Sequence, residues 1–147
     1  MIRDMQICDI KAALKLGEDM RKRSRFSAYP IHHGRSVFVL SDLIASPSVY
    51  TRVYDDDGLQ GVLVGEVTTD FFVDLDKAGT IFFYANSIMA LLRLVKDFEN
   101  WAAGRAHMIS VDVSGGVDDE RLAGVLKNRA GLAPAGGRMI KEFNYGC

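Results

Sequence analysis

The chain has 147 residues and a mass of 16.2 kDa, with 48% hydrophobic residues, 25% charged residues and a formal charge of −1. A chain of this length buries about two thirds of its unfolded surface, so we expect one compact domain over residues 1–147. The composition excludes a disordered or collagen-like chain. The near-zero charge excludes nucleic-acid binding by charge alone.

The cysteine content and the distribution of charge predict where the protein resides. The two cysteines, Cys8 and Cys147, suit neither a disulfide framework nor a zinc cluster, so we expect reduced thiols and no metal site. Acids and bases run through the N-terminal segment, and no apolar run reaches the length of a signal peptide or membrane span. The sequence therefore predicts a cytoplasmic protein that binds no membrane.

The first third of the chain has the periodicity of helices. Ile2–Met5 predicts a short strand, and Asp9 is placed to cap a helix whose apolar positions continue to Met20. A basic cluster at residues 21–25 ends that helix, and we interpret it as a solvated helix end. Residues 26–34 predict a loop, and Ser36–Ala45 a second helix.

The middle of the chain changes to the period of two that is typical of strands. Val49–Tyr54 and Leu59–Val67 flank Asp55–Gly58, which predicts an antiparallel hairpin with a tight turn. After a loop, Thr80–Ala85 predicts a buried strand. Ser87–Ala103 then predicts an amphipathic helix, with the Ser87 side chain as its N-terminal cap.

The last third predicts one more strand–helix–strand unit. Ala106–Val113 is the expected strand, and Asp118 or Asp119 can cap a helix that ends near Gly131. The closing stretch from Leu132 to Tyr145 is expected to form the final strands, with Gly136 and Gly137 at a turn. The order of elements predicts a mixed α/β layered fold.

The residues that carry a family resemblance lie in these last helices. The stretch Leu92–Ala102 and the segment from Asp119–Leu126 through Lys141–Phe143, together with the element order, resemble the GCN5-related N-acetyltransferases (GNAT proteins). Within that family the chain is most similar to small acetyltransferase-like proteins encoded by tailed phages. The resemblance implies a three-layer fold, with a central mixed, mostly antiparallel sheet flanked by about four helices.

The resemblance also implies acetyl-CoA as the acyl donor and an amine, on a small molecule or a protein, as the acceptor. Family members bind acetyl-CoA in a V-shaped opening between two central strands, with a glycine-rich loop around the pyrophosphate at a helix N-terminus. The matching segment, Ala85–Ala90, contains neither glycine nor a basic residue. The implied cofactor-binding residues are Phe83, Tyr84, Ala85, Asn86, Ser87 and Ile88.

The catalytic residues depart from the family pattern as well. The position of the tyrosine that commonly protonates the departing thiolate is Leu126 here, whereas Tyr84 and Tyr145 are available elsewhere. Glu66 is the candidate general base, because it lies on a strand expected to line the acceptor side of the cleft. The pair His32–His33 is an alternative base that we interpret as a solvated loop pair.

Two function classes therefore remain open. One is an N-acyltransferase that uses acetyl-CoA and a base such as Glu66. The other is a catalytically inactive GNAT-like interaction or structural protein, for example a phage protein that acts in the virion or on a host factor. In the second case the partner is another protein or a further copy of the chain. A clear opening between the strands around Ala85 and Val113 would favour the enzyme.

Overall fold

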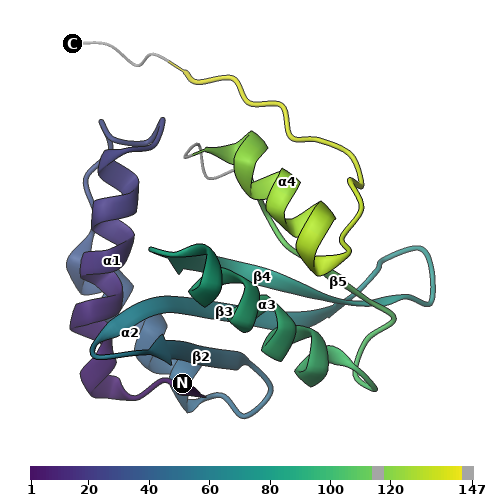
Figure 1. Cartoon of the computed structure of the whole chain (residues 1–147), viewed down its shortest axis with the longest axis horizontal. Helices are drawn as coiled ribbons and strands as arrows, with labels where there is room; N and C mark the ends of the chain where they lie inside the picture. Colours follow the sequence, from purple (N-terminus) through teal and green to yellow (C-terminus); the bar gives the residue numbers. More distant parts are fainter. Residues whose placement is uncertain (114–117, 144–147) are drawn as a thin grey trace.

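A five-stranded sheet lies at the centre of the computed structural model, which describes residues 1–113 and 118–143 (Figure 1). The described strands follow the sheet order β1-β2-β3-β4-β5. Their bounds are Ile2–Asp4 (β1), Tyr50–Asp55 (β2), Leu59–Thr69 (β3), Asp76–Ala85 (β4) and Met108–Ser110 (β5). Neighbours from β1 to β4 are antiparallel, whereas β5 runs parallel to β4.

Helices cover both faces of this sheet. Helices α1 (Ile10–Lys22, after a single 3₁₀ turn at Ile7–Asp9) and α2 (His33–Ala45) lie on one face. Helix α3 (Ile88–Ala102) packs on the opposite face, and α4 (Asp119–Ala130) packs against α3 (Figure 1). This arrangement confirms the predicted three-layer α/β fold with a mixed, mostly antiparallel sheet and four flanking α-helices in the described chain.

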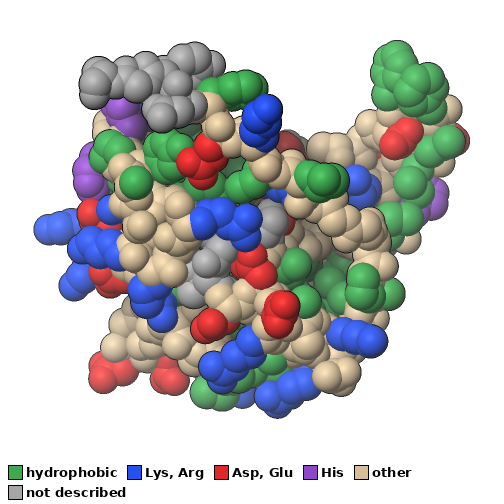
Figure 2. Space-filling model, turned by 90° about the horizontal axis from the view of Figure 1, so that it is seen from above, with side chains coloured by type: hydrophobic (Ala, Val, Ile, Leu, Met, Phe, Trp, Pro, Cys, Tyr) green, Lys and Arg blue, Asp and Glu red, His purple; other side chains and the backbone are tan. Residues whose placement is uncertain are grey.

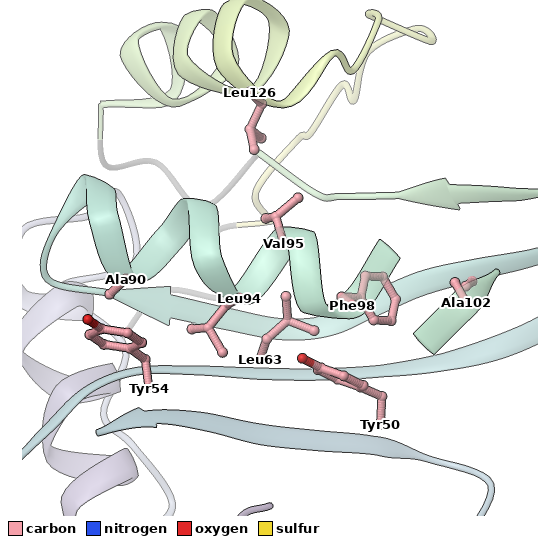
Figure 3. Close-up of a cluster of buried hydrophobic side chains, with 10 residues drawn as sticks. Tyr50, Tyr54, Leu63, Ala90, Leu94, Val95, Phe98, Ala102 and Leu126 are labelled. Atoms are coloured by element: carbon pink, nitrogen blue, oxygen red, sulfur yellow. The ribbon is translucent and has the colours of Figure 1, made fainter. Parts of the chain in front are cut away.

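Alternation along β3 separates the two hydrophobic clusters. Val62 and Val64 point toward α1 and α2, whereas Leu63 between them points toward α3. Both faces are buried, which explains the nearly continuous apolar sequence of this strand. Figure 3 shows the α3 side, where Leu94 and Phe98 of α3 lie over Leu63, and both are fully buried.

The helix ends confirm some of the predicted caps and correct others. Ser87 caps α3, since its hydroxyl accepts a hydrogen bond from the Ala90 N–H at 3.1 Å. Asp9 stands before α1 but does not cap it, because its carboxylate accepts hydrogen bonds from Arg3 and from the Gln6 N–H. Helix α2 begins at His33 rather than Ser36, where His32 Nδ1 accepts from the Arg35 N–H at 3.1 Å.

The strand bounds differ from the prediction on both sides of β4. The β3–β4 hairpin reaches Thr69 and Asp76, beyond the apolar runs, because backbone pairing continues between exposed polar residues. Strand β5 is shorter than the predicted Ala106–Val113 strand. It ends at Ser110, and the Asp112 N–H is bound by the Thr80 hydroxyl at 3.1 Å in place of a strand partner.

The predicted closing strands are wrong for the residues that the structure describes. Residues 131–143 form no strand, and Gly131 and Gly136 have positive φ values of 71° and 107°. Pro134 lies between them and has no N–H to contribute to a ladder. Tyr145 and Cys147 lie outside the described residues.

The tip of the β3–β4 hairpin carries exposed aromatic side chains. Phe71 and Phe72 are 90% and 89% exposed and lie edge to face, with ring centroids 4.8 Å apart. Asp70 fixes the turn by accepting hydrogen bonds from the N–H groups of Phe72 and Val73. The hairpin stands away from the body of the molecule, as Figures 1 and 2 show.

Candidate functional site

Strands β4 and β5 pair over only a few residues and then separate. The last pair in register is Gly79 with Ser110, whereas β4 continues to Ala85. On the β3 side of this point a register shift between Val64 and Gly65 leaves Ile81 as an extra residue of β4. The part of β4 from Ile81 to Ala85 therefore has no β5 partner in the described chain. Some of its backbone groups are directed into the opening, because N–H groups alternate between the edges of a strand.

A cavity of about 560 Å³ occupies this opening and extends beneath α1 and α2. Ala13, Leu14, Gly17 and Met20 of α1 line it, together with Val39 and Leu40 of α2. Phe82, Phe83 and Tyr84 of β4 form its floor, and Leu122 of α4 closes the far side. A cavity of this size and lining is typical of a small-molecule site.

The predicted cofactor segment is only partly within this cavity. Phe83 and Tyr84 line it, whereas Ala85, Asn86, Ser87 and Ile88 do not. These four residues instead form the turn that connects β4 to α3, where the Asn86 N–H is bound to the Gln60 carbonyl at 3.0 Å. The turn lies next to the cavity because it follows directly on β4.

The start of α3 offers backbone donors for an anion. The Ala90 N–H is occupied by Ser87, whereas those of Ile88 and Met89 have no acceptor among the described residues. No residue of the turn has a positive φ, so the turn does not form a left-handed cradle. The unpaired β4 edge and these two N–H groups suit the chain of amides and the phosphates of a coenzyme A thioester. The turn itself supplies no positive charge.

Tyr84 lines the cavity and offers a phenol hydroxyl as a possible proton donor. Its ring lies against Gly17 of α1, where an added Cβ would be 3.2 Å from Tyr84 Cε2. Burial raises the pKa of the Tyr84 phenol, so the hydroxyl keeps its proton at neutral pH. The sequence named Tyr84 as a substitute acid and also as a donor contact, and the cavity lining is consistent with either role.

Four charged side chains of the described chain line the cavity, and none of them was predicted individually as a site residue from the sequence. They are Arg21, Arg35, Asp112 and Asp119. Asp112 is 2.9 Å from Arg138 of the C-terminal segment, and Asp119 is 2.8 Å from Arg25. Only the fold shows that these residues share one cavity, because they come from four separate elements. The sole sequence signal was the basic cluster that contains Arg21.

The C-terminal segment contacts two regions that border the cavity. Arg138 binds Asp112 at the β5 side. Glu142 accepts a hydrogen bond from the Tyr29 hydroxyl at 3.1 Å, in the loop between α1 and α2. The negative charge of Glu142 raises the pKa of Tyr29 through this bond. Residues 138–142 (yellow in Figure 1) therefore connect Asp112, which lines the cavity, with the loop between α1 and α2.

Glu66, the predicted general base, lies outside the cavity lining. It is exposed and stands opposite Gly79, level with the last β4–β5 pair. No hydrogen bond or ion pair holds its carboxylate among the residues that the structure describes. It is separated from the opening by one strand, a spacing of about 4.8 Å. Its role as a base stays a prediction.

Three residues that could have blocked the opening do not enter it. Ile88 is half-buried and Met89 is 51% exposed at the start of α3, and neither lines the cavity. Leu126 points from α4 toward Val95 of α3 and is buried there (Figure 3). None of these three side chains therefore fills the opening, and Leu126 supplies no proton donor.

The described residues contain neither a metal-ligating cluster nor a membrane-spanning helix. They contain no group of three or more His, Cys, Asp or Glu side chains that could hold a metal ion. Among the same residues, no helix combines the length and apolar character needed to cross a bilayer.

The layered fold, with its parallel β4–β5 pair that separates above α3, is the fold of the GNAT acetyltransferases. Three solved structures illustrate the likeness. One is a protein from Agrobacterium tumefaciens str. C58 with a provisional acetyltransferase assignment, which has a TM-score of 0.73 and 12% identity over 97% of this chain and 99% of the other.

The second is the aminoglycoside antibiotic 6'-N-acetyltransferase AAC(6')-IG from Acinetobacter haemolyticus, with a TM-score of 0.67 and 12% identity over 99% of each chain. The third is a transcriptional regulator from Bacillus halodurans C-125, with a TM-score of 0.70 and 17% identity over 97% of this chain and 99% of the other. No protein-family model and no curated protein matches the sequence. At these identities the likeness shows the fold, and the activity must be argued from the site.

Proposed function

We propose that the protein is an N-acetyltransferase that takes the acetyl group from acetyl-CoA and transfers it to a primary amine. The observation that carries this proposal is the cavity that continues through the β4–β5 opening. No side chain of the described residues fills this cavity, and a void of this size would lower the stability of a protein that bound nothing in it.

The donor would be held by backbone groups more than by side chains. The unpaired edge of β4 from Ile81 to Ala85 can bind the amides of the pantetheine arm, as a strand would. The N–H groups of Ile88 and Met89, at the start of α3, would bind a phosphate of the donor. Phe83 and Tyr84 would border the acyl end.

The reaction requires a proton acceptor for the amine and a proton donor for the thiolate. The nitrogen–carbon bond forms at the acetyl carbonyl as the carbon–sulfur bond breaks. The ammonium proton would go to a carboxylate, and Asp112 is in the cavity whereas Glu66 is not. The thiolate would take its proton from the buried phenol of Tyr84.

Binding of the donor is the first test. Isothermal titration of the full chain with acetyl-CoA should give saturable binding. Leu122→Trp should abolish it, because the indole would fill the cavity beside β4. Lys127→Trp adds the same group at an exposed position of α4 and should bind normally. The absence of binding at millimolar acetyl-CoA would refute the proposal.

Turnover tests the assigned roles. Release of free coenzyme A in the presence of an amine should fall about 10²-fold or more in Tyr84→Phe and in Asp112→Asn. Glu66→Gln should retain activity if Asp112 is the base. A large loss in Glu66→Gln with none in Asp112→Asn would instead establish the base predicted from the sequence.

A non-catalytic role is the second candidate. Leu126 is buried at the position where related enzymes commonly carry a tyrosine, and the turn at Ala85–Ile88 has neither glycine nor a basic side chain. If acetyl-CoA fails to bind, these residues indicate a GNAT-like interaction or structural protein. A phage origin, with action in the virion or on a host factor, belongs to this candidate.

A further inference from the structure

The cavity has a mostly apolar lining, with acidic side chains on one side and basic side chains on the other, and this distribution limits which acceptors can bind. Apolar side chains from three elements form most of the lining, among them Leu14, Val39 and Phe82. Phe26 and Ile31 add to it from the loop between α1 and α2. A polyamine or a sugar would leave polar groups without partners against these walls. The body of the acceptor should therefore be apolar.

Each acidic side chain of the cavity forms an ion pair with an arginine. Asp112 and Asp119 face the opening from the β5 and α4 side, and each is within 3 Å of an arginine outside the lining, as the distances to Arg138 and Arg25 show. An acceptor with several positive charges would have to displace these ion pairs. The β5 and α4 side of the cavity therefore suits an acceptor with a single amino group, the one that reacts.

The basic charges on the opposite wall have no acidic partner among the described residues. The Arg21 guanidinium donates hydrogen bonds to the carbonyls of Ser27 and Tyr29 at 2.6 and 2.8 Å. Because both acceptors are neutral, these bonds do not compensate its positive charge. Its Nε is buried and has no acceptor among the described residues. Arg35 at the start of α2 has no hydrogen bond or ion pair from its side chain in the described chain. The α1–α2 wall therefore has a net positive charge.

We infer, on the basis of the proposed transferase function, that the acceptor is a primary alkylamine that carries an aromatic ring, with a carboxylate at the end remote from its nitrogen. The amine would lie at the β4–β5 opening, the ring between Phe82 and Val39, and the carboxylate at Arg35. Arg35 is the specificity residue in this arrangement, because a guanidinium binds a carboxylate with two parallel hydrogen bonds. Arg21 adds positive charge to this wall, but its guanidinium is already bound to the carbonyls of Ser27 and Tyr29.

A comparison of matched amines tests this assignment. Coenzyme A release is followed with 4-(2-aminoethyl)benzoate, with 2-phenylethylamine, which lacks only the carboxylate, and with spermidine. We expect kcat/KM for the benzoate to exceed that of 2-phenylethylamine at least about tenfold, mainly through KM. Spermidine should be the poorest. Equal rates for the first two amines, or a preference for spermidine, would overturn the inference.

Variants of Arg35 separate a carboxylate contact from a structural effect. Arg35→Gln should lower kcat/KM for the benzoate about tenfold and leave that for 2-phenylethylamine unchanged, whereas Arg35→Lys should retain part of the preference. Arg129→Gln removes an exposed arginine from α4, outside the cavity lining, and should change neither. An equal loss for both amines in Arg35→Gln would contradict the assignment.

Direct binding distinguishes this inference from the proposed function. The benzoate is titrated against the full chain without acetyl-CoA and followed by calorimetry. If acetyl-CoA does not bind but the benzoate does, and Arg35→Gln weakens it, the carboxylate site stands and the transferase proposal fails. If acetyl-CoA binds and the benzoate neither binds nor reacts, the acceptor assignment is wrong and the transferase proposal stands.

Discussion

Gly65 lies where α3 packs most closely on the sheet. A Cβ added to this residue would be 2.6 Å from Cε2 and 2.8 Å from Cζ of Phe98. The carbonyl oxygen of Gly79 would be 2.9 Å away on the neighbouring strand, so the new methyl group could not move in that direction. Gly65 is also at the register shift of β3 on β4, level with the end of the β4–β5 pairing.

Gly65→Ala should therefore destabilise the protein by overpacking. Phe98 is fully buried, and its ring is fixed by Tyr50 and Trp101 at centroid distances of 5.1 and 5.7 Å. Overpacking of a close-packed core costs about 1–3 kcal/mol, and with the ring held on two sides we expect about 2–3 kcal/mol. Urea unfolding followed by circular dichroism measures this loss as a lower midpoint at unchanged slope.

Two further variants determine whether the clash is the cause. Phe98→Leu should cost less in the Gly65→Ala background than alone, with a coupling of at least about 0.5 kcal/mol. Gly124→Ala is the control, because its Cβ would meet nothing within 4 Å in α4, and it should stabilise by about 0.5–1 kcal/mol. The reasoning is refuted if Gly65→Ala costs under about 0.5 kcal/mol, or if the two core substitutions are additive.

Two other predictions concern polar contacts of the sheet. Hydrogen bonds from Arg3 lower the pKa of both Asp9 and Asp55, so their contribution to stability is present above the ordinary carboxyl pKa of about 4 and is lost as the pH falls below it. Arg3→Met should flatten the acid side of a plot of unfolding free energy against pH, and an unchanged acid side would contradict this. The Tyr50 hydroxyl donates to Asp97 at 2.7 Å, so Tyr50→Phe should cost about 1–2 kcal/mol in thermal unfolding. A midpoint equal to that of the unsubstituted protein would count against that bond.

The predictions that succeeded depended on local patterns with a strong physical cause. The apolar residues around Val62 and Val64 and the turn at Asp55–Gly58 predict a hairpin from local sequence alone, without contacts from the rest of the chain. Ser87 caps α3 because a serine before an apolar helical run has few better partners than the first-turn N–H groups. The fold class could be predicted because strands and helices identified in this way follow one another in the order of a mixed α/β layered fold.

The predictions that failed depended on contacts that hydrophobic periodicity does not specify. Asp9 has the sequence position of a cap, yet Arg3 and the Gln6 N–H compete for its carboxylate. Apolar residues such as Met139 and Ile140 suggest a strand, but no neighbouring edge pairs with them among the described residues, and Met139 is 99% exposed. Periodicity reports which side chains could be buried, not whether a partner surface exists.

The candidate site was predicted only in its position along β4. The family resemblance implied Phe83 and Tyr84 as cofactor-binding residues; both line the cavity, and their contact with a cofactor stays a prediction. Arg35 and Asp112 could not be identified, because neither lies in a motif and the folded topology alone brings α2 and the end of β5 together. Glu66 was assigned from its strand, and its distance from the opening depends on a register that the sequence leaves undetermined.

The cavity also divides the molecule into parts of unequal local stability. The α3 face is a continuous core of fully buried side chains, whereas α2 contributes a single buried residue, Leu40, and covers the hollow instead of filling it. Amide hydrogens of α2 should therefore exchange with solvent through local opening, long before those of α3, which require global unfolding. A molecule held in the cavity would bind only the closed form and slow that exchange. Protection of α2 amides thus provides a way to detect ligands that requires no knowledge of the reaction.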